Sequence, residues 1–62
     1  MNIEFNGKHI SIESEMTVGE LLDRLDLKAD DYIVVRDGRI SRLTELLDED
    51  SSVIILRAIV GG

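Results

Sequence analysis

The two glycines at the C-terminal end, Gly61 and Gly62, are the first candidates for chemistry in this chain. Glycine loses more backbone entropy on ordering than any other residue, so a Gly-Gly pair adds nothing to a fold. A frayed chain end is the structural alternative to a function. Here, however, the pair closely follows the most apolar run of the sequence, residues 53–56. We therefore interpret the Gly62 carboxylate as the reactive group, with the preceding strand holding it out.

The rest of the sequence predicts no catalytic or metal site. The single histidine, His9, has no cysteine or second histidine with which to form a dyad or a zinc site. No P-loop or Gly-rich nucleotide fingerprint is found. The adjacent acids Asp30 and Asp31 favour a solvated loop, because neighbouring carboxylates point in different directions. We expect no catalytic residue, no metal and no cofactor bound by the domain itself.

The composition is that of one small acidic domain. Ile, Leu and Val together number 21 among the 62 residues, which is enough for one compact core. A net charge of −6 argues against nucleic acid, whose binding depends on clustered Lys and Arg. The sequence contains no cysteine, no signal-peptide pattern and no apolar run of membrane-spanning length. We therefore expect a cytoplasmic protein that binds neither nucleic acid nor membranes.

The first thirteen residues predict a β-hairpin. Apolar and polar residues alternate on both sides of Asn6-Gly7, a dipeptide typical of type I′ turns. A two-residue turn at this point sets Ile3 opposite Ile10 and Met1 opposite Ile12, so the apolar side chains share one face.

A short helix is predicted next. The residues Thr17-Val18-Gly19-Glu20 have the spacing of a capping box. Apolar residues then recur at the spacing of an amphipathic helix; they are Val18, Leu21, Leu22 and Leu25. We expect this helix to end near Asp26 and Leu27 to fold back onto the core.

The second half of the chain predicts strands. Residues 32–36 are strand-like, and Asp37-Gly38 forms a second tight turn into a short strand at 39–41. The near-helical spacing of Leu43, Leu46 and Leu47 favours a helical turn. After a turn at 48–51, the last strand at 52–58 carries four consecutive aliphatics, which suits a central strand shielded on both faces. Because one helix can cover only one sheet face, we expect some aliphatic surface to stay exposed as a partner site.

In this order of elements the chain resembles the β-grasp sulfur carriers of the ubiquitin-like superfamily, most closely the ThiS family of thiamine biosynthesis. The matching residues are Asn6-Gly7, residues 17–22, Asp37-Gly38 and the final strand running to Gly61-Gly62. The resemblance implies an α+β, β-grasp fold with a mixed four- to five-stranded sheet on one main helix. It implies a domain at residues 1–58 and a flexible tail at 59–62.

The resemblance also implies a carrier cycle. A ThiF- or MoeB-like adenylating enzyme would use ATP to activate the Gly62 carboxylate. A sulfur donor, either a cysteine desulfurase or a rhodanese-like protein, would displace AMP and leave a thiocarboxylate. Thiazole synthase would receive the sulfur. The alternatives are a MoaD-like small subunit docking into the molybdopterin synthase large subunit, a protein modifier joined to lysine through Gly62, or an interaction module with an inert tail.

A docking surface follows from the same resemblance. Related folds turn the positions of Val53 and Ile55 inward and those of Ile54 and Leu56 outward. Ile54 and Leu56, with Val35 from the third strand, are therefore the predicted partner-docking patch of a protein that is monomeric when free. The apolar residues of the tail, Ile59 and Val60, would anchor it in a groove of the partner.

Overall fold

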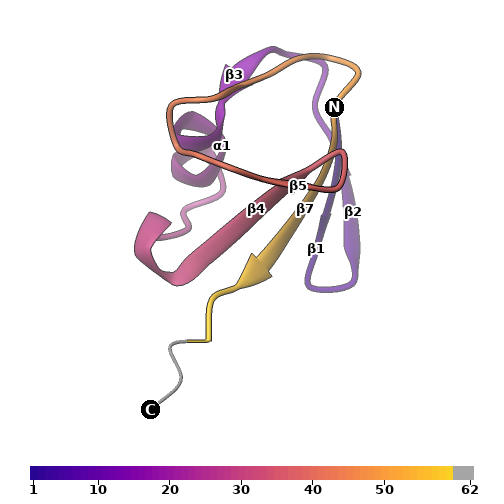
Figure 1. The fold of residues 1–62 in the computed structure, drawn as a ribbon. Helices are drawn as coiled ribbons and strands as arrows, with labels where there is room; N and C mark the ends of the chain where they lie inside the picture. The colour runs from indigo at the N-terminus through magenta and orange to yellow at the C-terminus, as the bar shows by residue number, and fades with distance from the viewer. Residues whose placement is uncertain (60–62) are drawn as a thin grey trace.

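The computed structural model describes residues 1–59, which form a five-stranded mixed sheet, a small two-stranded sheet and one α-helix (Figure 1). The elements in chain order are β1 (Asn2–Phe5), β2 (Lys8–Ser11), β3 (Met16–Thr17), α1 (Val18–Arg24), the 3₁₀ turn η1 (Ala29–Asp31), β4 (Tyr32–Arg36), β5 (Arg39–Ser41), β6 (Leu46–Leu47) and β7 (Ser52–Arg57).

The large sheet has the strand order β2-β1-β7-β4-β5, so the last strand of the chain lies at its centre. β1 and β7 run parallel, with Ile3 opposite Val53, and every other neighbouring pair in this sheet is antiparallel. Helix α1 lies on one side of the sheet (Figure 1). The predicted α+β class with a mixed sheet and one main helix is confirmed.

Both hairpins form around the predicted turn dipeptides. Asn6 and Gly7 have φ angles of 53° and 78°, and Asp37 and Gly38 have φ angles of 48° and 85°. Positive φ at both central residues is the signature of a type I′ turn, whose twist matches that of the strands. The first turn sets Ile3 opposite Ile10, as its length requires.

Helix α1 begins at a complete capping box. Glu20 N–H donates to the Thr17 hydroxyl at 3.1 Å, and Thr17 N–H donates to the Glu20 carboxylate at 3.0 Å. At the other end, Asp26 has φ 59° and the Leu27 N–H donates to the Leu22 carbonyl at 2.8 Å, which is a Schellman motif with Asp in the left-handed position. The predicted helix end and the return of Leu27 are confirmed.

No helix within residues 1–59 has the length and apolarity needed to cross a membrane.

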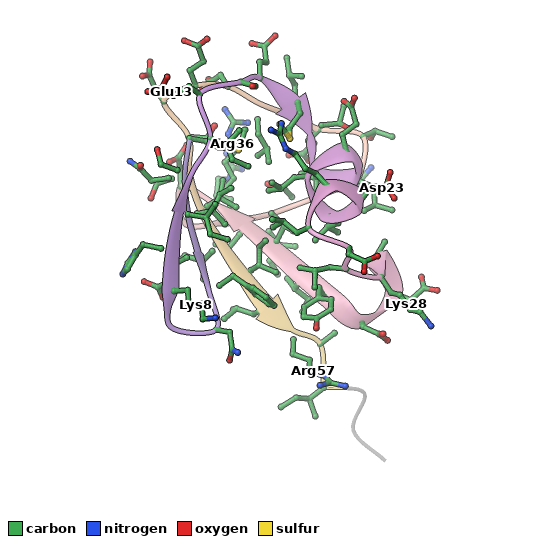
Figure 2. The ribbon with its side chains drawn as sticks, turned by 180° about the vertical axis from the view of Figure 1, so that it is seen from behind. Lys8, Glu13, Asp23, Lys28, Arg36 and Arg57 are labelled. Carbon is green, nitrogen blue, oxygen red and sulfur yellow. The ribbon has the colours of Figure 1, made fainter. Side chains whose placement is uncertain are left out.

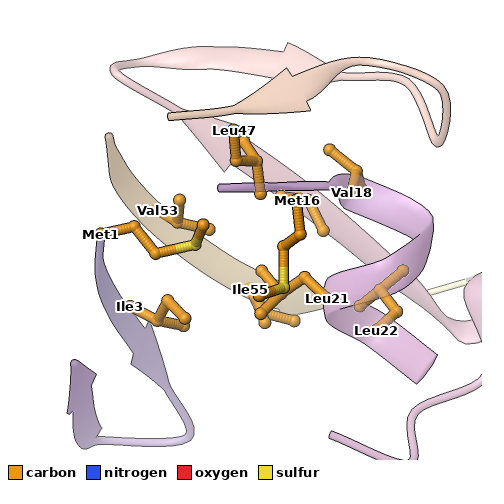
Figure 3. Close-up of a cluster of buried hydrophobic side chains, with 10 residues drawn as sticks. Met1, Ile3, Met16, Val18, Leu21, Leu22, Leu47, Val53 and Ile55 are labelled. Atoms are coloured by element: carbon orange, nitrogen blue, oxygen red, sulfur yellow. The ribbon is translucent and has the colours of Figure 1, made fainter. Parts of the chain in front are cut away.

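The core lies between α1 and the inner sheet face (Figure 3). Strands β1, β3, β4, β6 and β7 and helix α1 turn apolar side chains inward, and Leu21 and Leu47 are completely buried. The buried hydrophobic residues are Met1, Ile3, Met16, Val18, Leu21, Leu22, Val34, Leu47, Val53 and Ile55.

The predicted helical turn around Leu43, Leu46 and Leu47 is wrong. Leu46–Leu47 is strand β6, which pairs with β3 (Met16–Thr17). The preceding loop crosses the beginning of α1, where carbonyls of the loop accept from helix N–H groups that have no intrahelical partner. Val18 N–H donates to Glu45 O at 3.0 Å, and Gly19 N–H donates to Leu43 O at 2.9 Å.

A second expectation is also corrected. β7 is central, but only one of its faces is shielded, because α1 and the small sheet lie on the same side. The other face carries exposed aliphatic side chains, in agreement with the expectation that one helix leaves some of them uncovered.

Candidate functional site: an open sheet face beside the chain exit

Strand β7 divides its aliphatic residues between two environments. Val53 and Ile55 are 1% and 3% exposed, whereas Ile54 and Leu56 are 37% and 51% exposed. Successive residues of a strand point to opposite faces, so this alternation puts Ile54 and Leu56 on the face away from α1. The structure therefore exposes both residues, while their role in docking stays a prediction.

β4 contributes to the same open face. Val35 is the register partner of Ile54, and Ile33 is the register partner of Leu56. Both β4 side chains are half-buried. The predicted patch residue Val35 thus lies beside Ile54, and Ile33 completes a block of four aliphatic side chains across the two central strands.

Ile40 extends this block onto edge strand β5, and sequence reasoning missed it. It lies opposite Val35 and is 73% exposed. The Asp37-Gly38 dipeptide could have predicted the position of Ile40, because a two-residue turn there sets Ile40 opposite Val35. We define the outer apolar patch as Ile33, Val35, Ile40, Ile54 and Leu56.

The other half of the open face is polar. Glu4 on β1 is the register partner of both Ile54 and His9, and both Glu4 and His9 are exposed. His9 lies on a surface strand, as predicted. Within residues 1–59, no three His, Cys, Asp or Glu side chains are grouped so that they could hold a metal ion. The outer apolar patch therefore has a polar border on its β1 side.

The chain leaves the sheet at the end of β7. Ala58 N–H donates to the Asp31 carbonyl at 2.8 Å, which extends the pairing of β7 past Tyr32. The next residue, Ile59, is 91% exposed. The remaining residues of the predicted tail, Val60, Gly61 and Gly62, lie outside the described residues. The chain thus exits beside Leu56, a member of the outer apolar patch.

The other end of β7 is fixed by a hydrogen-bonded turn. Ser51 is 2% exposed, and its hydroxyl accepts from Asp48 N–H and donates to the Asp48 carboxylate, both at 3.0 Å. The Ser51 carbonyl accepts from Asn2 N–H at 3.0 Å. Ser52 N–H donates to the Asp37 carboxylate at 3.1 Å. These bonds fix the beginning of β7 in the sheet. The chain exit at the other end of β7 is therefore held in a defined position relative to the sheet.

The one lowered pKa and the two ion pairs found within residues 1–59 lie away from the chain exit. The backbone N–H of Thr17, and then its hydroxyl, hold the pKa of the Glu20 carboxyl below its ordinary value of 4.5. Arg36 lies 3.6 Å from the Asp37 carboxylate and 3.9 Å from that of Asp48. Both sets of contacts stabilise the ends of structural elements, and neither adjoins the outer apolar patch at Leu56.

Comparison with known proteins agrees with this geometry. The family model described as the ThiS family matches residues 2–62. Among solved structures, the thiamine biosynthesis protein ThiS from Geobacter metallireducens is 25% identical, with full coverage of both chains and a TM-score of 0.71. No curated protein matches the chain. Because the family model spans nearly all of the sequence, this chain belongs to the ThiS family.

Proposed function

We propose that this protein is a sulfur carrier of thiamine biosynthesis and that the Gly62 carboxylate is its reactive group. The observation that carries the proposal is the family match, which extends to Gly62 itself. The domain would act as a substrate of partner enzymes and not as an enzyme.

The chemistry requires an activated carboxylate. A free carboxylate is a poor electrophile, so an adenylating enzyme would join the Gly62 carboxylate to the α-phosphate of ATP and release pyrophosphate. The terminal sulfur of a persulfide on a cysteine desulfurase or a rhodanese-like protein would attack the carbonyl carbon, and AMP would leave, giving an acyl disulfide. A second thiol would then attack the donor's sulfur, form a disulfide with the donor and release the thiocarboxylate. The resulting thiocarboxylate would supply sulfur to the thiazole ring made by thiazole synthase.

The geometry of the described residues supports such a role. The outer apolar patch would be the surface that the adenylating enzyme binds. Leu56 of this patch is only three residues from Ile59, which is exposed. Four extended residues span at most about 13 Å, so the reacting carbon stays close to that surface. Gly61 and Gly62 have no Cβ, so they would fit a narrow channel that leads to the active site of the adenylating enzyme.

Intact-mass spectrometry of the protein from its native cells tests the proposal. A sulfur carrier gains the mass of one oxygen-to-sulfur exchange at Gly62, and the exchange disappears when the adenylating enzyme is deleted. Adducts with other proteins would instead indicate a modifier, and an unmodified terminus under thiamine starvation would contradict both.

A glycine variant sharpens the test. Gly62→Ala should unfold at the wild-type temperature but lose most thiocarboxylate formation, because the added Cβ occupies the channel that the terminal residue enters. Gly7→Ala is not a suitable control, since Gly7 has φ 78° and needs its conformational freedom. Ala58→Gly, which leaves the terminus unchanged, serves better. Full thiocarboxylate formation by Gly62→Ala would count against the proposed channel.

A further inference from the structure

The last two residues of β7 are paired on one side only. The parallel ladder between β1 and β7 ends where Phe5 faces Ile55. The antiparallel ladder with β4 continues for two further residues, to the pair of Tyr32 and Arg57. Beyond Phe5 the chain turns away at Asn6, so within residues 1–59 no strand lies beside Leu56 and Arg57 on the β1 side.

The backbone of Arg57 faces this open side. In an antiparallel ladder, every second residue directs its N–H and C=O toward the same neighbour. Ala58 N–H bonds to Asp31 O, and Ser52 O accepts from Asp37 N–H, both at 2.8 Å, so even-numbered residues of β7 face β4. The N–H and C=O of Arg57 therefore point the other way, into the space that β1 has left.

A groove occupies that space. Its lining includes Glu4, Phe5, Gly7, Tyr32, Leu56 and Arg57. The rings of Phe5 and Tyr32 meet edge to face with their centroids 5.7 Å apart, and both residues are half-buried. Arg57 is exposed at the end of β7 (Figure 2). The groove thus combines an aromatic wall, an unpaired strand edge, one cation at Arg57 and one carboxylate at Glu4.

The charge of Arg57 stands out in its part of the chain. It is the only basic residue after Arg42, in a protein with a net charge of −6. Both ion pairs found among the described residues are made by Arg36, so neither uses the Arg57 guanidinium. The Arg57 guanidinium, at the end of β7, would be complementary to an acidic side chain of a partner.

We propose that an extended segment of the adenylating enzyme pairs with the open edge of β7 at Arg57 and places a carboxylate beside its guanidinium. This inference rests on the proposed function, since it assumes that such an enzyme binds. Unpaired strand edges recruit an added strand through main-chain hydrogen bonds, while neighbouring pockets and charges select its sequence. The groove adjoins the outer apolar patch at Leu56, so one partner can cover both.

A second copy of the chain fits this edge less well. Antiparallel self-pairing centred on Arg57 would put two arginines opposite each other, and directly opposed like charges destabilise a sheet. It would also join two chains that each carry a net charge of −6. A partner segment with an acidic residue meets neither objection.

The test removes the donor that the proposal uses. Chemical synthesis of the 62-residue chain allows the amide between Leu56 and Arg57 to be replaced by an ester, which deletes the Arg57 N–H. The Arg57 N–H takes no part in pairing with β4, but the Leu56 carbonyl faces β4 and becomes a weaker acceptor in the ester, so the midpoint of urea unfolding should fall only slightly. The KM for the chain in ATP–pyrophosphate exchange by the adenylating enzyme should rise about tenfold, the effect of one lost hydrogen bond at the upper end of its usual range.

A charge variant gives an independent reading. Arg57→Gln should raise the same KM about tenfold or more and should weaken the dependence of KM on salt, since the lost contact is ionic. Arg24→Gln on helix α1 changes the charge equally and should leave KM at the wild-type value. Hydrogen exchange of the Arg57 amide should slow in the complex, which a purely apolar contact at the patch would not cause.

Three results would overturn the inference. If wild-type chain is adenylated but the ester analogue keeps its KM, the edge is not used and the proposed function stands. If Arg57→Gln forms dimers and keeps the wild-type KM, the charge only prevents self-pairing. If the adenylating enzymes of the native cell show no exchange with the wild-type chain, the proposed function and this inference both fail.

Discussion

Val35 and Ile54 are register partners across β4 and β7, and their alternation with the buried Val34 and Ile55 puts both side chains on the sheet face away from helix α1. Their neighbours on the same strands, Val34 and Ile55, are buried beneath the helix. The two central strands therefore belong half to the core and half to the surface. Substitutions at adjacent positions of one strand should consequently affect stability and binding separately.

The first prediction concerns stability and compares two isoleucines. Ile55→Ala should lower the free energy of unfolding by about 2–5 kcal/mol, because it removes a core side chain that is 3% exposed and leaves a cavity. Ile54→Ala should cost less than about 1 kcal/mol, since its side chain already contacts solvent. Urea unfolding at neutral pH measures both. Equal losses would mean that the open face is covered in solution.

The second prediction concerns docking. Ile54→Asp and Leu56→Asp should each fold but raise the KM for adenylation at least about tenfold, because each places a charge in the centre of an apolar contact. Ser11→Asp, on the exposed edge strand β2 of the same sheet, adds the same charge outside the outer apolar patch and should have little effect. A folded Ile54→Asp protein that is adenylated like wild type would exclude this patch as the docking surface.

The third prediction concerns pH. Hydrogen bonds from Thr17 lower the pKa of the Glu20 carboxyl in the folded protein. A lowered folded-state pKa contributes stability above the unfolded-state pKa, and this contribution disappears as pH falls through the folded-state value. The stability advantage of wild type over Glu20→Gln should therefore be present at neutral pH and shrink below about pH 4. Paired urea titrations measure it, and a difference independent of pH would contradict the assignment.

The fourth prediction concerns the turn before β7. Ser51→Ala should destabilise the protein by about 1–2 kcal/mol, because the Asp48 N–H loses its acceptor at a nearly buried site. Ser52→Ala is the matched control, since Ser52 is exposed and uses only its backbone in the bonds described. Thermal unfolding distinguishes the two. A Ser52→Ala effect as large as that of Ser51→Ala would rule out the hydroxyl contacts as the cause.

Local signals in the sequence predicted most of the fold. Asn6-Gly7 and Asp37-Gly38 fix the hairpins because their φ angles must be positive, and Thr17 with Glu20 fixes the helix start because side chains satisfy the free N–H groups. Each of these features depends on residues within four positions of one another. Short-range chemistry is therefore enough to place them.

The features that were missed depend on distant residues. β6 exists because Leu46–Leu47 meets Met16–Thr17, which lies thirty residues earlier, and no local pattern at Leu43 reveals that pairing. The leucine spacing suggested a helical turn, but the carbonyls of this loop are taken by the start of α1. For the candidate site, Ile54, Leu56 and Val35 were placed on one face through a family resemblance. Ile40 was missed because its place on this face depends on the pairing of β5 with β4, which the predicted patch did not include.

The pairing of β1 with β7 makes folding wait until the chain has been synthesised through β7. A nascent chain that has emerged from the ribosome only as far as β4 lacks β7, the strand that lies between β1 and β4. The sheet and the core beneath helix α1 therefore cannot form. Such long-range closure is intrinsically slow, because the loop entropy is lost before the contacts form. A chain that terminates before β7 should therefore stay unfolded and be degraded, which means that folding itself selects molecules that extend at least to Arg57, where the tail begins to leave the sheet.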